Sequence, residues 1–226
     1  MSKNPKNSIS EPIILYKNDN ISKTFATIRS KILDSEGENT IRSIMMTSAI
    51  RGEGVSTVAL NYAAVTAESD GSRVLLIDSN LRHPSLHKVF GVDNSVGFSD
   101  VLFADVDLKR AIQNSGMPNL DILPAGEYKV NLNRLFSRSA VKQALDRINN
   151  SYDSIILDSP AVTAFSDAST IAGAVDGVML VIAAHRTRRE VITEAISRLE
   201  SSGAHLVGTT LNKRAYVIPA TIYNKL

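Results

Sequence analysis

Short apolar runs alternate with helical patterns along most of this chain, and that alternation constrains its fold more than any other feature. Uninterrupted apolar runs are typical of strands that are buried on both faces of a parallel sheet. We predict strands at residues 41–47, 74–77, 120–123, 154–157, 177–183 and 204–211, and the first two have this buried pattern. Strands that alternate with helices form a doubly wound sheet with right-handed crossovers. The sequence therefore predicts an α/β fold whose mainly parallel sheet carries helices on both faces.

The segments between these runs place apolar side chains at the spacing of amphipathic helices. Helices are predicted at residues 21–33, 58–65, 140–149 and 187–202, and Pro84 suits the first turn of another. Residues 1–20 have little hydrophobic periodicity, which predicts a flexible N-terminal lead-in. No repeat or low-complexity linker divides the remainder, so we expect residues 21–226 to form a single domain.

The composition of the chain excludes several kinds of functional site and partner. The chain has no cysteine, which excludes disulfides, thiolate metal sites and cysteine nucleophiles and fits a reducing compartment. A formal net charge of +2 is too close to neutral to indicate nucleic acid, and we expect no nucleic-acid partner. No apolar run approaches the length of a membrane span, and the polar N-terminus is unlike a signal peptide. These features predict a soluble cytoplasmic protein.

The segment between the first predicted strand and its helix has the spacing of a phosphate-binding P-loop. Alanine occupies the first glycine position, and Val55 stands where the motif has lysine. Glycines let backbone N–H groups curl around phosphate, and Ser56 stands where a hydroxyl would bind Mg²⁺. The expected nucleotide contacts in this loop are Gly52, Glu53, Gly54, Val55, Ser56 and Thr57.

Two other predicted strands each end on an aspartate, Asp78 and Asp158. One such aspartate is usually only a turn or capping residue. In a parallel sheet, however, both would meet the P-loop at the carboxyl ends of the strands, where ligands bind. A Mg²⁺–nucleotide site needs one carboxylate near the metal and another to orient a nucleophile. The sequence therefore predicts metal ligands at Ser56, Asp78 and Asp158, with the two aspartates as the catalytic candidates.

With these segments in place, the chain resembles the cytoplasmic domain of bacterial tyrosine kinases, the polysaccharide-biosynthesis branch of the MinD/ParA-like P-loop proteins. Further runs carry the resemblance: LRHPSLH at 81–87, GFSDVL at 97–102, LPAG at 123–126, SDA at 166–168 and LNKR at 211–214. The resemblance implies binding of ATP or ADP with Mg²⁺ and a role in capsule or exopolysaccharide assembly. It also implies an inner-membrane polysaccharide co-polymerase as partner, and hence peripheral association with the inner face of the cell membrane. Assembly into a homo-oligomer stays open. By the same resemblance, Arg82 and Asn212 are nucleotide contacts, and Tyr216 and Tyr223 are the remaining tyrosines of a phosphorylated tail.

The chain departs from the family pattern at several positions. Val55 replaces the phosphate-binding lysine, and Asn80 replaces an aspartate. The family's Glu-x-x-Arg-x-x-Arg assembly motif falls on Lys23, Ala26 and Arg29, so only its last member remains. We therefore predict a degenerate, weakly active or inactive kinase-like protein that regulates polysaccharide polymerisation or export. Two alternatives stay open: an active tyrosine autokinase in which Arg51 compensates for Val55, and a MinD/ParA-like ATPase switch.

Overall fold

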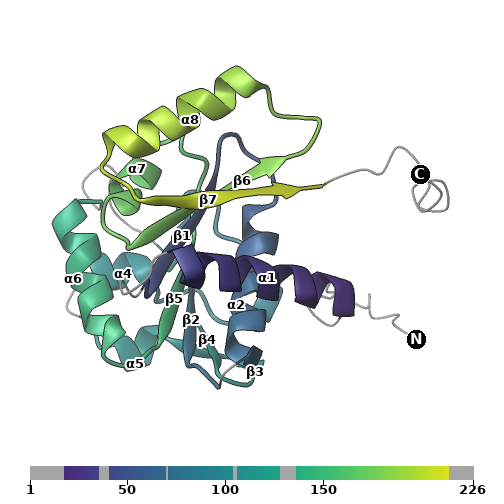
Figure 1. Cartoon of the computed structure of the whole chain (residues 1–226). Helices are drawn as coiled ribbons and strands as arrows, with labels where there is room; N and C mark the ends of the chain where they lie inside the picture. The colour runs from purple at the N-terminus through teal and green to yellow at the C-terminus, as the bar shows by residue number, and fades with distance from the viewer. Residues whose placement is uncertain (1–17, 36–40, 70, 104–105, 128–135, 214–226) are drawn as a thin grey trace, which may run out of the picture.

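A seven-stranded sheet in the order β3-β4-β2-β5-β1-β6-β7 forms the centre of the structure (Figure 1). The computed structural model describes residues 18–35, 41–69, 71–103, 106–127 and 136–213. Six strands run parallel, and β3 pairs antiparallel with β4. The predicted doubly wound α/β fold is confirmed. The strands are β1 Ser43–Ser48, β2 Val74–Asp78, β3 Gln113–Met117, β4 Leu120–Leu123, β5 Ser154–Asp158, β6 Gly177–Ala183 and β7 Leu206–Asn212.

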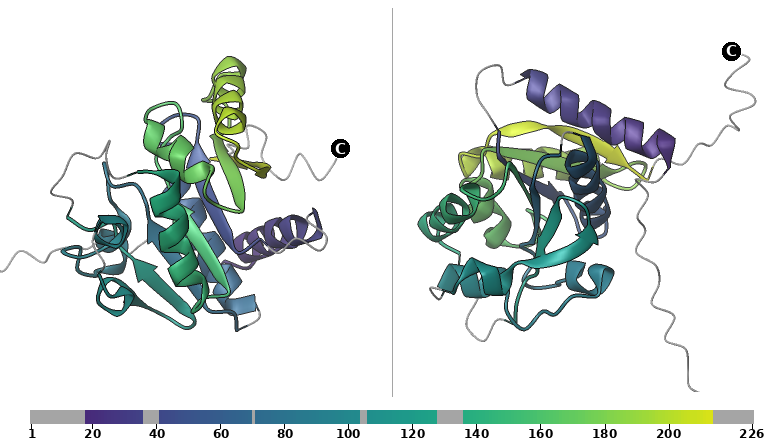
Figure 2. Two further views of the ribbon diagram at one scale, coloured as in Figure 1. Left: turned by 90° about the vertical axis from the view of Figure 1, so that its left-hand side faces the viewer. Right: turned by 90° about the horizontal axis from the view of Figure 1, so that it is seen from below.

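Helices cover both faces of the sheet, because the side chains of its central strands alternate between two apolar clusters. In β2, Leu75 and Ile77 belong to one cluster, and Val74 and Leu76 belong to the other. Figure 2 shows α1 and α6 on opposite sides of the sheet. The first group of helices is α1 Asp19–Ser35, α2 Val55–Ser69 and α3 Leu86–Phe90. The second group is α4 Phe98–Phe103, α5 Leu108–Ala111, α6 Arg138–Asn149, α7 Ser166–Ala172 and α8 Arg189–Ser201.

The strand order brings three strand ends together. β5 lies between β1 and β2, and all three strands are parallel, so their carboxyl ends share one edge. The register pairs Asp78 of β2 with Asp158 of β5 and pairs Asp158 with Met46 of β1. The N–H of Ser79 donates to the carbonyl of Asp158 at 2.9 Å, which keeps the ends of β2 and β5 side by side.

Several elements differ from the sequence-based expectations. The strand β3 was not expected because its sequence QNSGM is polar and contains a glycine, and only alternate side chains are partly buried at this sheet edge. The helices α4, α5 and α7 have four to seven residues, too few to show helical periodicity. Residues 1–17 of the expected flexible lead-in lie outside the described residues. Within the described ranges, no helix is long and apolar enough to cross a bilayer.

Two leucine-to-alanine changes in strands test how this core stabilises the fold. Leu76 in β2 is fully buried, whereas Leu211 in β7 is 68% exposed. Leu76→Ala should lower the free energy of unfolding by about 2–5 kcal/mol, because it removes buried methyl groups and leaves a cavity. Leu211→Ala should lower it by less than about 1 kcal/mol. Urea unfolding measures both, and equal losses would contradict this account of the core.

Candidate functional site

The loop that joins β1 to α2 curls because two of its glycines adopt left-handed backbone angles. Gly52 has φ of +81° and Gly54 has φ of +91°, a region that other residues rarely adopt. A side chain at position 54 is also excluded by space, since an added Cβ would lie 2.3 Å from the amide nitrogen of Asn212. Both glycines of the predicted P-loop are therefore required by its shape. The helix α2 begins directly after this loop, at Val55.

The carboxylate of Glu53 fixes this loop to the sheet. The side chain is fully buried and accepts hydrogen bonds from the N–H of Ile50 at 2.9 Å and the N–H of Ala183 at 2.7 Å. It also accepts one from the hydroxyl of Thr187. A buried carboxylate is tolerated only when donors satisfy it, and these three come from the loop itself, the end of β6 and the turn that follows. The side chain of Glu53 is therefore already engaged, and a nucleotide contact at Glu53 stays a prediction for its backbone N–H alone.

Asp78 and Asp158 form the acidic centre of the site. Asp78 is buried and accepts hydrogen bonds from the N–H groups of Asn80, Ser85 and Leu86 at 2.9–3.2 Å. Asp158 is 1% exposed, and neither of its carboxylate oxygens has a hydrogen-bond partner. The two residues are paired across neighbouring strands. A buried acidic pair with unsatisfied oxygens is unfavourable without a positive partner.

The environment raises the pKa of both carboxyl groups. Burial raises the pKa of Asp78 to about 6, and the hydrogen bonds from Leu86, Ser85 and Asn80 oppose that rise. Burial also raises the pKa of Asp158 well above its usual range, and the negative charge of Asp78 adds to the effect. The nearby hydroxyl of Ser56 opposes the rise at Asp158, although this contact falls short of a hydrogen bond. Both groups therefore hold their protons more tightly than ordinary aspartates.

The donor set fits a hard divalent cation. Mg²⁺ takes oxygen ligands, often one or two carboxylates with a hydroxyl or substrate phosphates. The unpartnered oxygens of Asp158 are suited to that role, and their burial next to Asp78 would be relieved by a positive charge. Ser56 lies at the same site, where its hydroxyl accepts a hydrogen bond from the hydroxyl of Ser85 at 3.3 Å. Ser56 and Asp158 are thus compatible with the predicted metal site, whereas both carboxylate oxygens of Asp78 already accept backbone hydrogen bonds.

A cavity of about 310 Å³ opens between the loop and the ends of β2 and β5. The predicted residues Gly52, Gly54, Val55, Ser56, Thr57 and Asp158 all line it. Val55 also packs against the apolar cluster beneath α1 and α2, so residue 55 brings no charge to the cavity. Cavity residues that were not predicted as contacts include Ser48, Arg51, Asn80, His83, Ser85, Ser159, Pro160, Ala161 and Phe165.

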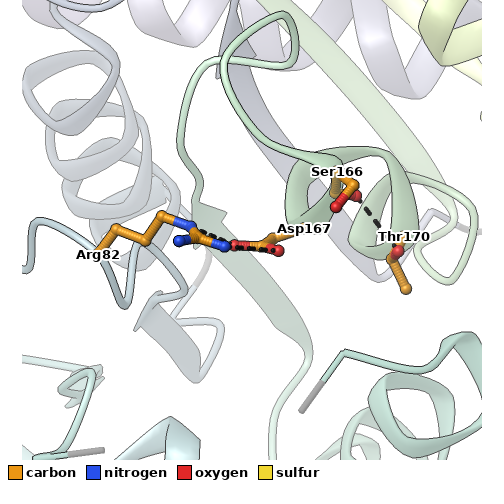
Figure 3. Close-up of polar contacts among 4 residues, drawn as sticks. All are labelled: Arg82, Ser166, Asp167 and Thr170. Atoms are coloured by element: carbon orange, nitrogen blue, oxygen red, sulfur yellow. Dashed lines mark hydrogen bonds and ion pairs between the residues drawn. The ribbon is translucent and has the colours of Figure 1, made fainter. Parts of the chain in front are cut away.

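The side chains of Arg82 and Asn212, which were predicted to contact nucleotide, form hydrogen bonds with other residues of the chain. The Nε of Arg82 lies 2.7 Å from a carboxylate oxygen of Asp167, at the start of α7 (Figure 3). Its guanidinium lies over the ring of Phe165, 4.4 Å from the centroid, and Arg82 is not among the residues that line the cavity. Asn212 donates from its amide nitrogen to the carbonyl of Glu53 at 2.8 Å, which holds the loop from the β7 side. Tyr216 and Tyr223 lie outside the described residues.

The buried charge of Asp158 predicts a substitution that stabilises the protein. A pKa raised by folding means that stability falls as pH rises through the range between the unfolded and folded values. Without Mg²⁺, Asp158→Asn should therefore raise the free energy of unfolding at pH 7 by about 1–3 kcal/mol, with a smaller gain near about pH 4, where the carboxyl group is protonated. Chemical denaturation measures both. Asp146→Asn, an exposed change on α6, is the control, and a destabilised Asp158→Asn at pH 7 would contradict the prediction.

Comparison with known proteins identifies the family to which this chain belongs. The AAA domain family matches residues 41–204. The tyrosine-protein kinase YwqD of Bacillus subtilis is 35% identical over 191 residues, which cover 84% of this chain and 80% of YwqD. The solved kinase domain of the Escherichia coli tyrosine kinase ETK matches with a TM-score of 0.84 and 28% identity, over 96% of this chain and 86% of that one. A plasmid partition protein from Borrelia burgdorferi, 20% identical with a TM-score of 0.61 over 83% of this chain and 88% of its own, shares the fold alone. The chain therefore belongs to the family of bacterial tyrosine-protein kinases, within the wider MinD/ParA-like P-loop fold.

Proposed function

We propose that this chain is a degenerate member of its family that binds nucleotide at the P-loop but transfers phosphoryl groups weakly or not at all. The observation that carries the proposal is that Val55, an uncharged residue, lines the cavity at the position of the phosphate-binding lysine. A lysine there would donate charge-assisted hydrogen bonds worth about 1.5–3 kcal/mol each. Loss of a comparable cation from a phosphoryl-transfer site lowers the rate on the order of 10³-fold or more.

Other parts of the site support binding without efficient transfer. The curled loop with its two left-handed glycines keeps backbone N–H groups available for phosphate. Ser56 and Asp158 would hold Mg²⁺, which would neutralise phosphate charge, and Asp78 would lie beside them. Asn80 also lines the cavity, and its buried side-chain oxygen has no hydrogen-bond partner. That oxygen can ligate a cation weakly but cannot accept a proton as an aspartate would.

The biological setting follows from the family. The proposed role is regulation of capsule or exopolysaccharide polymerisation or export, by docking to a membrane co-polymerase at the cytoplasmic face of the membrane. The side chains of Lys23 and Ala26 are exposed on α1, where the family's assembly motif would be. Neither residue matches that motif, which supports a docking module in preference to a ring of self-phosphorylating subunits.

Restoring the lysine tests the proposal. With Mg-ATP, the natural chain should give no phosphotyrosine signal above that of Asp78→Ala on an immunoblot, because any remaining transfer is too weak to detect. Val55→Lys should tighten ATP binding roughly 10- to 150-fold by calorimetric titration, because it restores a charge-assisted donor at the phosphates. Val55→Met, which has a similar length but no charge, is the control and should leave affinity nearly unchanged.

The same assay separates the alternatives. A phosphotyrosine signal from the natural chain that disappears in Asp78→Ala would establish an active autokinase and refute the proposal. Hydrolysis of ATP without phosphotyrosine, together with ATP-dependent dimers in solution, would instead favour the ATPase switch.

A further inference from the structure

Two cationic side chains from distant parts of the chain meet on one carbonyl of the phosphate loop. Arg186, in the turn after β6, donates from Nη1 to the carbonyl oxygen of Gly52 at 3.1 Å. Lys213, directly after β7, donates from Nζ to the same oxygen at 2.7 Å. Neither side chain contacts a carboxylate within the described part of the chain. Two full positive charges thus converge on a neutral acceptor.

Both side chains lie directly against the loop. A Cβ added to Gly52 would lie 3.2 Å from Nη1 of Arg186. A Cβ added to Gly54 would lie 3.6 Å from Cε of Lys213, at van der Waals distance. The two cations therefore contact the glycines on either side of Glu53, next to the position where Val55 has replaced the lysine.

The surroundings do not neutralise these charges. Glu53 adjoins the shared carbonyl in sequence, but its carboxylate is engaged by Ile50, Ala183 and Thr187. Glu190 lies four residues after Arg186 and forms no ion pair with it among the described residues. Like charges that share one carbonyl repel each other, and both would gain from an anion. Hydrogen bonds to an ionised acceptor are about twice as strong as those to a neutral one. Long, exposed side chains such as these can turn from the carbonyl to an anion at small cost.

We propose that Arg186 and Lys213 supply the positive charge for phosphate groups held by this loop, in place of the charge that is missing at residue 55. The ligand class is a nucleoside diphosphate or triphosphate. The inference rests on the proposed function in one respect, because it requires the loop to bind phosphate. Arg186 and Lys213 lie against the loop and do not line the cavity, so they would have to turn toward a phosphate bound there. Arg51 is the competing source of charge, since it does line the cavity, but no hydrogen bond within the described residues holds its side chain on the loop.

Calorimetric titration of the full chain with ADP and with inorganic pyrophosphate tests the assignment. Arg186→Gln and Lys213→Gln should each weaken binding roughly 5- to 20-fold, and the double variant should weaken it further. Lys213→Arg, which keeps the charge, should retain most of the affinity. Arg189→Gln removes the same charge from an exposed position on α8 and should change affinity less than about twofold.

Repeating these substitutions in the Val55→Lys variant shows whether Arg186 and Lys213 replace the missing charge or only support the loop structurally. In Val55→Lys, the loss caused by the Arg186→Gln/Lys213→Gln pair should shrink, because the restored lysine already supplies the charge. An equal loss in both backgrounds would overturn the inference, as would affinities that match Arg189→Gln or a loss confined to Arg51→Gln.

The outcomes for this inference and for the proposed function are distinct. A natural chain that binds neither ADP nor pyrophosphate would overturn both the proposed nucleotide binding and the cation assignment, whereas binding that the Arg186→Gln and Lys213→Gln changes leave intact would overturn the cation assignment alone. Conversely, phosphotyrosine formation together with weakened ADP binding in the cation variants would refute the proposed function and uphold the assignment.

Discussion

The buried carboxylate of Glu53 is the interaction on which the site depends. Its three donors belong to the loop, to the end of β6 and to the turn before α8, so one side chain joins segments about 130 residues apart. Glu53 thereby ties the shape of the phosphate loop to the sheet, through contacts that need no lysine at residue 55. This explains how a loop can keep the geometry of a P-loop after its lysine has been replaced by valine.

The positive charges near the site lie on different elements from the residues that give the site its shape. The loop, the aspartate pair and the hydroxyl of Ser56 lie together at the carboxyl ends of the strands, where we propose that phosphate and a cation bind. The positive charge that normally completes such a site is absent from α2 and is found on Arg186 and Lys213, on the outer side of the loop. Cations on the outer side of the loop can stabilise a bound phosphate. They are less suited to stabilise the transition state of phosphoryl transfer, because that requires closely positioned groups.

The sequence was informative where the physical signal is local. Buried parallel strands appear as continuous apolar runs, and their aspartate ends meet because parallel strands end at one edge. The strand β3 was missed because a polar edge strand has no such pattern. The contacts of Glu53 with Ala183 and Thr187, and those of Arg186 and Lys213 with Gly52, were missed for a different reason. These contacts join residues more than 100 positions apart, and no periodicity records which distant side chain reaches a loop.

The unpartnered carboxylate of Asp158 links the site to the lifetime of the protein in the cell. Any ligand that binds only the folded state shifts the folding equilibrium toward that state. A divalent cation next to Asp158 would raise the free energy of unfolding in two ways. It would neutralise an unfavourable buried charge, and it would add its own binding energy. Proteases degrade chains that open, so the turnover of this protein should slow when cation and nucleotide are plentiful. Its abundance would then report the energy state of the cell even without catalysis.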